Sequence, residues 1–216
     1  MHRVVITGGT GMIGRLLVES LLAEGTDVVV LTRSVARVRD LFGGRASAAL
    51  WDGRTEKDWG QLVDGVDAVV NLAGEGLAEG RWTPEKKRRI VSSRVDAGRA
   101  VVAAVTAAGR KPRVLVQASA VGWYGPRGLP PVDESAPAGN GFLADVCKAW
   151  EPSTATVESM GVRRVVVRTA VVLSAAGGAL ARMLPPFRLG LGGRLGDGTQ
   201  GFPWIHIQDE VRAIRF

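Results

Sequence analysis

The residues whose types and spacing first suggest chemistry are the glycines near the amino terminus. The run from Thr7 to Gly14 carries glycines at positions 8, 11 and 14, between a valine-rich segment and an amphipathic one. In this spacing the first glycine permits a tight turn, the second lets the backbone approach a pyrophosphate, and the third allows close helix packing. The free N–H groups that begin the helix then face the anion. The predicted dinucleotide contacts are Gly8, Thr10, Gly11, Met12, Ile13 and Gly14.

The end of the second apolar segment indicates which dinucleotide is bound. An NAD site has an acid about 20 residues after the glycines to hold the ribose 2′-hydroxyl. This chain has Thr32-Arg33-Ser34 there, with an arginine and no acid. A guanidinium donates a forked, charge-assisted pair of hydrogen bonds to a 2′-phosphate, whereas an acid repels it. The sequence therefore favours NADP(H), and the alternative is that Arg33 is an ordinary exposed arginine.

Further cofactor contacts are predicted along the chain. Asp52 follows an apolar patch and is placed to accept a hydrogen bond from the adenine amino group. Arg94 shares the core-facing stripe of a predicted helix, and a buried arginine needs an anion. The cofactor phosphates are the nearest candidate for that anion. The alternative is that only the aliphatic part of the Arg94 side chain is buried and its guanidinium reaches water. Contacts are also expected where predicted strands end, at Leu72, Ala73, Gly74 and Ala118.

The elements that position these residues alternate between strands and helices, as in βαβ units with a parallel sheet. Valine-rich runs bounded by Gly, Asp or Pro predict strands buried on both faces. The fold class is α/β, a Rossmann-like doubly wound parallel sheet. The expected strands are 3–7, 27–32, 68–72, 113–118 and 163–167, and the expected helices are 12–24, 35–41, 84–108 and 141–159, the last with a kink or early end at Pro152.

The pattern weakens after Val172. A glycine- and proline-rich stretch fills 177–201, followed by a strand-like run at 202–207 and a short helix at 211–216 with Asp209 as its N-cap. We therefore expect a dinucleotide-binding domain at 1–172 and the start of a small C-terminal substrate lobe, apparently truncated, at 173–216.

Composition excludes several classes of protein. The 216 residues include one cysteine, Cys147, which rules out a disulfide framework or a multi-cysteine metal site and reads as a small core residue. No apolar run is long enough for a membrane span and no signal peptide is visible, so a soluble, cytoplasmic protein is expected. The net charge of +7 includes a basic cluster at 86–89. A solvent-exposed helix face explains this cluster more simply than a nucleic-acid-binding patch does.

Several motifs together resemble the extended, epimerase-like branch of the short-chain dehydrogenase/reductase superfamily. They are the glycine loop, Asn71-Leu72-Ala73-Gly74-Glu75, Ser119-Ala120-Val121-Gly122-Trp123-Tyr124-Gly125, Val166-Val167-Arg168 and Trp204-Ile205-His206-Ile207. The segments at 90–94 and 186–193 resemble its NADP(H)-binding, sugar-nucleotide-epimerase-like "epimerase family" subgroup. The resemblance implies cofactor contacts at Thr32, Arg33, Leu72, Ala73, Arg94 and Val172.

The catalytic signature departs from this superfamily, whose members use a Tyr-x-x-x-Lys pair with a Ser or Thr. Lys148 lies in the corresponding helix, but Ala144 stands at the tyrosine position and Ala120 at the serine position. The chain's single tyrosine is Tyr124. The catalytic candidates are therefore Tyr124 and Lys148, and Lys148 is also a candidate ribose ligand.

Two other side chains could carry protons. His206 is either a substrate-side acid or base or a structural residue of its strand. Glu75 either faces the nicotinamide pocket or is an exposed loop acid. Neither residue type decides between its two roles, so both remain open.

The resemblance implies hydride transfer at the nicotinamide to an unknown small polar substrate, with Tyr124 or a water as proton donor. The alternative is an NADP(H)-binding structural or redox-sensing protein without turnover. In related enzymes the helices at 84–108 and 141–159 pair with their copies in a homodimer. The apolar stripe that fits this, or equally a buried packing face, is Val91, Val95, Val102 and Val105.

Overall fold

The computed structural model describes residues 2–78, 80–128, 130–194 and 196–216, and its centre is a six-stranded parallel sheet. The strand order is β3-β2-β1-β4-β5-β6, the doubly wound order predicted from the sequence. Because the order reverses between β1 and β4, the chain leaves a crevice beyond the carboxyl ends of these two strands. The strands are β1 (Arg3–Thr7), β2 (Asp27–Thr32), β3 (Ser47–Leu50), β4 (Ala68–Asn71), β5 (Val114–Ala120) and β6 (Arg163–Thr169).

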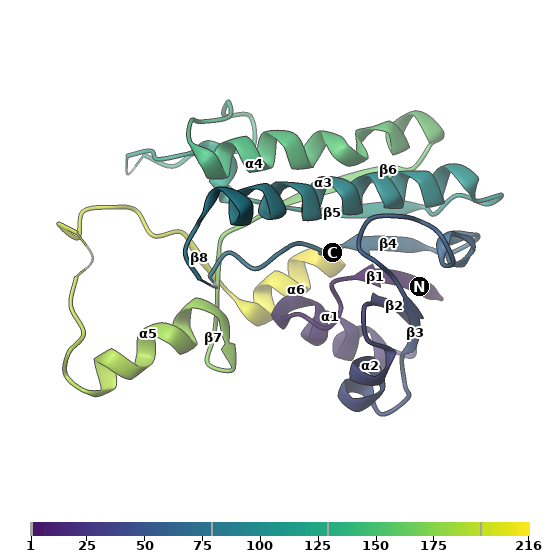
Figure 1. Cartoon of the computed structure of the whole chain (residues 1–216), viewed down its shortest axis with the longest axis horizontal. Helices are drawn as coiled ribbons and strands as arrows, with labels where there is room; N and C mark the ends of the chain where they lie inside the picture. Colours follow the sequence, from purple (N-terminus) through teal and green to yellow (C-terminus); the bar gives the residue numbers. More distant parts are fainter. Residues whose placement is uncertain (1, 79, 129, 195) are drawn as a thin grey trace.

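Helices cover both faces of the sheet (Figure 1). On one face lie α1 (Met12–Ala23), α2 (Val35–Phe42) and α6 (Ile207–Arg215), and on the other lie α3 (Pro84–Ala107) and α4 (Phe142–Trp150). Short 3-10 helices complete the connections: η1 (Gly60–Val63), η2 (Val121–Tyr124) and η3 (Glu151–Met160). Of the predicted kink or early end at Pro152, the structure shows the early end, because α4 ends at Trp150 and the chain continues as η3, with Pro152 in its first turn.

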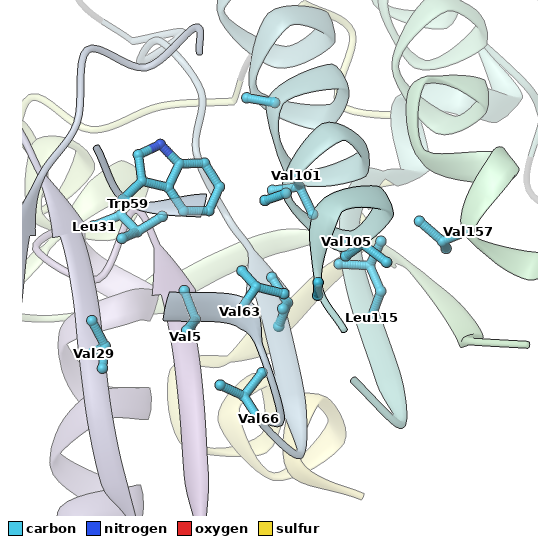
Figure 2. Packing of buried hydrophobic residues seen from close by; sticks show 14 of the residues in the cluster. Val5, Val29, Leu31, Trp59, Val63, Val66, Val101, Val105, Leu115 and Val157 are labelled. Carbon is cyan, nitrogen blue, oxygen red and sulfur yellow. The ribbon is translucent and has the colours of Figure 1, made fainter. Parts of the chain in front are cut away.

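Each face of the sheet has its own apolar core. Figure 2 shows the core under α3, where Trp59 and Leu115 lie among valines of β1, β2 and α3. The other core lies under α1 and α2 and includes Phe42 and Leu17, both fully buried. Strands buried on both faces need apolar side chains at successive positions, which explains the valine runs in β1 and β2.

Local signals in the sequence set the helix boundaries. Thr83 caps α3 by accepting a hydrogen bond from the backbone N–H of Lys86, and Pro84 occupies the first turn. Ser34 caps α2 in the same way, through the N–H of Arg37. Gly43 ends α2 in the left-handed conformation, with φ of 59°, which glycine adopts without strain.

The C-terminal fifth of the chain differs most from expectation. A small parallel sheet pairs β7 (Val171–Ser174) with β8 (Trp204–His206), and α5 (Gly178–Arg188) lies in the stretch for which no helix was predicted. The α6 helix begins at Ile207 and is capped by His206, so the prediction of Asp209 as N-cap is wrong; Asp209 lies in the first turn. No described residue of α5 is buried, and the α5 segment projects from the body in Figure 1.

The α6 helix returns to the body of the molecule. Val211 and Ile214 belong to the same core as α1, and Arg215 donates a 2.6 Å hydrogen bond to Ser20 of α1. The residues after Val172 thus contain both the projecting α5 and a helix that packs on the main sheet. Among the described residues, no helix is both long and apolar enough to cross a membrane.

Candidate functional site

The glycine loop joins β1 to α1 at the strand-order reversal, and its glycines are sterically required. Gly8 has φ of 68°, and a Cβ there would lie 2.8 Å from the carbonyl oxygen of Leu72. A Cβ on Gly14 would lie 2.3 Å from the carbonyl oxygen of Gly8, so only glycine lets the first turn of α1 pack on the loop. The backbone N–H of Gly11 donates to the Gly8 carbonyl at 3.0 Å and closes the turn.

The amino terminus of α1 is free to receive an anion. Among the described residues no side chain caps it, and its first turn contains no acid. The N–H groups that begin a helix carry partial positive charge, so an uncapped start of this kind suits a pyrophosphate. Gly11 is exposed there, and Thr10, Met12 and Ile13 are half-buried around it. The structure therefore gathers the predicted loop contacts around one uncapped helix start, which suits an anion.

A chain of buried polar side chains fixes the strand ends beside this loop. Thr7 donates to Asn71 at 2.6 Å, and Asn71 donates to Gln117 at 2.9 Å, so the chain runs from β1 through β4 to β5. All three residues are fully buried. Thr7 also accepts the N–H of Ala73 at 3.0 Å, and Gln117 donates to the carbonyl of Ala118 at 2.8 Å. These bonds hold Leu72 and Ala73 beside the loop and fix the carbonyl of Ala118 in β5.

The end of β2 presents a cation. Thr32 is buried, and its hydroxyl accepts the N–H of Ser34 at 3.0 Å, which shapes the turn into α2. Arg33 between them is exposed and makes no hydrogen bond or ion pair with any described residue. Because the turn is held by its neighbours, the Arg33 guanidinium is available to a ligand beyond the β2 end.

Asp52 follows β3, a strand that the sequence pattern did not predict. Its carboxylate accepts the N–H groups of Arg54 and Thr55 at 2.8 and 2.9 Å and the Thr55 hydroxyl at 3.0 Å. The backbone N–H of Thr55 is the main reason that the pKa of Asp52 lies below its usual value. Asp52 therefore shapes its own turn, and its predicted bond to adenine stays a prediction.

Arg94 is buried on the core side of α3, as its position in the helical stripe predicted. One nitrogen, Nη1, donates to the carbonyls of Glu75 and Ile90 at 3.1 and 3.0 Å, and the guanidinium stacks 4.9 Å above the ring of Trp150. Burial lowers the pKa of Arg94. Within the described chain no carboxylate forms an ion pair with Arg94. The guanidinium lies beside Gly74, where an added Cβ would be 3.0 Å from its carbon, so its charge is available to an anion near Gly74.

The face of α4 that meets the β5 end carries no tyrosine and no lysine. Residues 143, 147 and 151 are four apart and share one face of the helix. Leu143 packs on Gly122, the Cys147 sulfur lies 3.7 Å from the carbonyl oxygen of Ala120, and Glu151 accepts the hydroxyl of Ser119 at 2.6 Å. A Tyr-x-x-x-Lys pair that faced this edge would occupy positions 143 and 147.

The structure therefore does not bring Lys148 to the site. Lys148 is one residue after Cys147, and one step along an α-helix turns the side chain by about 100°, away from the face that meets β5. Lys148 is therefore exposed, and its ammonium lies 2.6 Å from the Asp145 carboxylate. Ala144, expected at the tyrosine position, is buried away from this face. The residue that faces Ala120 is Cys147, which is buried, and burial raises the pKa of its thiol.

Tyr124 belongs to a network that sequence reasoning missed. Arg168 of β6 forms two bonds to Glu151, at 2.9 and 3.0 Å, and donates from Nη1 to the Tyr124 hydroxyl oxygen at 3.1 Å. The guanidinium also lies 4.2 Å from the ring of Trp123, and the bonds to Glu151 raise its pKa. The cation beside Tyr124 is thus Arg168, and not Lys148. The sequence signal for this network was Glu151, four residues after Cys147 on the same helix face, together with Arg168 in an otherwise apolar strand.

The two remaining proton-carrying candidates have structural partners. Glu75 pairs with Lys86 at 2.8 Å and with Arg89 at 3.2 Å, and the Lys86 ammonium holds the pKa of Glu75 below its usual value. His206 caps α6, its Nδ1 accepting the N–H of Gln208 at 3.4 Å. The structure favours the ion-pair and capping roles for these side chains.

The turn after β7 lies against the start of α1. Val172 is buried in β7, and the following turn brings Gly178, with φ of 71°, against the α1 amino terminus. A Cβ on Gly178 would lie 2.9 Å from the sulfur of Met12. From α5, Arg182 donates a hydrogen bond to the carbonyl of Ala78 in the loop that follows β4. The predicted contacts Met12 and Val172 thus lie at one end of the crevice.

Comparison with known proteins matches this arrangement to a family. The model of the "NAD dependent epimerase/dehydratase family" matches residues 4–216. The chain belongs to this family. It is 42% identical over 213 residues to the epimerase family protein SDR39U1 homolog, chloroplastic, of Arabidopsis thaliana. This match covers 98% of this chain and 60% of that protein. It is also 42% identical to the epimerase family protein Mb2239 of Mycobacterium bovis, over 99% of this chain and 68% of the relative.

Solved structures of similar proteins share the fold. The crystal structure of human epimerase family protein SDR39U1 (isoform 2) with NADPH has a TM-score of 0.82 at 34% identity, over 97% of this chain and 67% of that one. A UDP-galactose 4-epimerase has a TM-score of 0.78 at 26% identity, over 99% of this chain and 70% of that one. This member of the family therefore has an NAD(P)-binding Rossmann fold and spans 60% of the length of its Arabidopsis relative.

Proposed function

We propose that this chain binds NADP(H) in preference to NAD(H). The observation that carries the proposal is Arg33, an exposed guanidinium without a partner among the described residues, at the end of β2. The strand end that would carry the ribose-binding acid of an NAD site holds this cation instead. The human relative was solved with NADPH, which supports the same choice.

The residues present fit a dinucleotide. The uncapped start of α1 would hold the pyrophosphate, Arg33 the 2′-phosphate, and Arg94 a further anionic group of the ligand. A bound NADPH supplies a hydride. The chain's part is to orient that ligand, with Thr7 and Asn71 fixing the strand ends beside it.

The test compares two affinities in two proteins. Dissociation constants for NADPH and NADH are measured by calorimetry with the unmutated chain and with Arg33→Ala. Loss of a charge-assisted hydrogen bond of about 1.5–3 kcal/mol should remove roughly 10- to 100-fold of the NADPH preference and leave NADH binding unchanged. Arg39→Ala, which removes an exposed arginine from α2, is the charge-matched control. Equal affinities in the unmutated chain would contradict the proposal.

The reaction that we propose is hydride transfer at the nicotinamide to or from a small molecule, in an atypical oxidoreductase or epimerase-like enzyme. A second candidate is an NADP(H)-binding protein without turnover. The observation that favours the second candidate is the α4 face, where Leu143 and Cys147 occupy the positions of the usual phenol and ammonium. NADPH oxidation with any acceptor, measured on a full-length family member, separates the two.

A homodimer through α3 and the α4–η3 segment is also proposed. A groove between these elements is lined by Val95, Val102 and Pro152, among others. Val105 of the predicted stripe is fully buried in the core, which fits the alternative of a packing face for this residue; Val91, Val95 and Val102 are half-buried and remain candidates for the interface. Light scattering at high protein concentration should give twice the mass of the chain.

A further inference from the structure

The hydroxyl of Tyr124 accepts a hydrogen bond and keeps its own proton free. Its oxygen lies 3.1 Å from Nη1 of Arg168, which donates to it. A guanidinium has no acceptor atom, so the phenolic proton cannot turn back to Arg168. Within the described part of the chain no other group accepts this proton, and Tyr124 is half-buried rather than enclosed. Ser119 differs, because its hydroxyl donates to Glu151 at 2.6 Å. The phenol is therefore able to give its proton to a bound molecule.

Arg168 is held in place by groups other than Tyr124. Its Nε and Nη2 donate to the Glu151 carboxylate at 2.9 and 3.0 Å, and Nη1 also donates to the carbonyl of Glu134 at 3.2 Å. The guanidinium carbon lies 4.2 Å from the centre of the Trp123 ring. The bonds to Glu151 raise the pKa of Arg168, so the guanidinium keeps its charge. A fixed cation with one spare donor thus determines where the phenol oxygen lies.

The strand order places this pair at the carboxyl edge of the sheet. Tyr124 ends η2, which begins directly after β5, and β5 pairs with β4, the strand beside the order reversal. In open parallel sheets ligands bind beyond the carboxyl ends of the strands at that reversal. A Cβ on Gly122 of η2 would lie 3.2 Å from the Cβ of Leu143, so η2 also meets the α4 face. The phenol therefore lies at the edge that the usual tyrosine serves, on a different element.

We propose that Tyr124 donates the proton when a carbonyl compound is reduced by NADPH, and that Arg168 is the positioning residue that holds the phenol oxygen. This inference rests on the proposed NADP(H) function. The carbonyl carbon receives the hydride from C4 of the dihydronicotinamide, the C=O π pair moves to the oxygen, and that oxygen takes the phenolic proton. NADPH is thereby oxidised by two electrons and the carbonyl compound is reduced by two. The phenolate that remains forms a charge-assisted hydrogen bond with Arg168 and recovers its proton from water.

The first test is spectroscopic and needs no turnover. Because Tyr124 is the single tyrosine, chain labelled with ¹³C at the tyrosine Cζ gives one resonance, which reports on this phenol alone. Arg168→Lys keeps a cation for Glu151 but cannot bond the carboxylate and the phenol together, so the resonance should move. Arg163→Lys, at an exposed position of the same strand, is the matched control and should leave it in place.

The same resonance tests where Tyr124 lies relative to the nucleotide. Saturation with NADP⁺ should shift it, whereas adenosine 2′,5′-bisphosphate, which lacks the nicotinamide, should not. No shift in chain that binds NADP⁺ by calorimetry, or equal shifts with both nucleotides, would overturn the inference and leave the proposed function intact. An unmoved resonance in Arg168→Lys would overturn the role of Arg168. Failure to bind NADP⁺ at all would instead contradict the proposed function.

The second test measures NADPH oxidation with 4-nitrobenzaldehyde as the carbonyl probe. Tyr124→Phe should lower kcat about 100-fold and leave the KM for NADPH within about 2-fold, because the phenol acts on the proton and not on the nucleotide. Arg168→Lys should lower kcat about 10-fold, since the phenolate loses one charge-assisted bond. Tyr124→Phe keeps the Glu151–Arg168 pair, so it tests the phenol even if Arg168→Lys fails to fold. An unmutated rate that does not exceed that of Tyr124→Phe would overturn the inference.

Discussion

The two halves of the sheet's carboxyl edge are built in different ways. In the half formed by β1 and β2, the backbone makes most of the site: glycines that admit no Cβ and an uncapped helix start, with the exposed Arg33 beside them. In the half formed by β5 and β6, side chains bind one another through the Glu151–Arg168 pair, and the α4 face offers Leu143 and Cys147. The first half is equipped for a nucleotide, whereas the second lacks the superfamily's proton relay.

The largest effect should come from the backbone-built half. Gly14→Ala places a Cβ 2.3 Å from the Gly8 carbonyl oxygen, so α1 must shift away from the loop that holds the pyrophosphate. We expect NADPH affinity to fall about 100-fold or more, as measured by calorimetry. Gly109→Ala is the control, because the nearest atom to its Cβ would lie at an ordinary 3.5 Å and binding should not change. Unaltered affinity in Gly14→Ala would show that the loop does not hold the ligand in this way.

The side-chain-built half should respond in stability more than in nucleotide affinity. Arg168→Met leaves the buried Glu151 carboxylate without its cation, and removing one partner of a buried pair costs about 3–5 kcal/mol. Denaturant unfolding should show this loss, with NADPH affinity in the folded protein unchanged. Arg163→Met, at an exposed position of the same strand, should alter stability by less than about 0.5 kcal/mol. A loss below 1 kcal/mol in Arg168→Met would mean that the pair is not a stabilising centre.

This contrast also explains which features the sequence could predict. The bounds of β1 and β2 and the role of the glycines follow from local patterns, namely valine runs and a three-residue glycine spacing. The Glu151–Arg168 pair joins residues 17 positions apart on different elements. Local patterns mark each residue separately, an acid on the α4 face and an arginine in an apolar strand, but do not specify that the two pair. The structure turns Lys148 toward solvent and Asp145, and the pattern did not indicate this because one residue of helical register decides whether a side chain faces the site or the solvent.

The weaker local signals were missed for related reasons. β3 is short and alanine-rich, Ser47–Leu50, and therefore lacks the β-branched residues that mark the other strands. α5 buries no residue and contains Pro185 and Pro186, so neither an apolar stripe nor composition predicts a helix there.

A smaller effect separates two cations that the sequence placed in the cofactor site. Arg94→Met should weaken NADPH binding about 10-fold, since it removes a buried charge that no described carboxylate neutralises. Lys148→Met should change the affinity by less than about 2-fold, because the ammonium is exposed and paired with Asp145. Equal losses in the two variants, measured by the same calorimetric titration, would return Lys148 to the site.

The smallest effect is a pH dependence at the junction between the sheet and α6. Glu210 is 2% exposed, accepts the Thr169 hydroxyl at 2.6 Å, and has its pKa raised, mainly by burial. Below the ordinary pKa of a glutamate, the acid is neutral in both folded and unfolded chain and contributes no penalty. As the pH rises from that ordinary pKa up to the raised folded pKa, the unfolded chain ionises while the folded acid stays protonated, so this group lowers stability across that window.

Glu210→Gln keeps the shape and the acceptor for Thr169 but cannot ionise. Its free energy of unfolding should exceed that of the unmutated chain at pH 7, and the two should converge near pH 4. Urea unfolding across this range measures the difference, and Asp40→Asn, at an exposed acid of α2, should show no comparable convergence. A variant less stable than the unmutated chain at pH 7 would mean that the charged form of Glu210 has a partner that stabilises it. The junction between α6 and the sheet would then resemble the Glu151–Arg168 half of the molecule, where a buried acid depends on its cation.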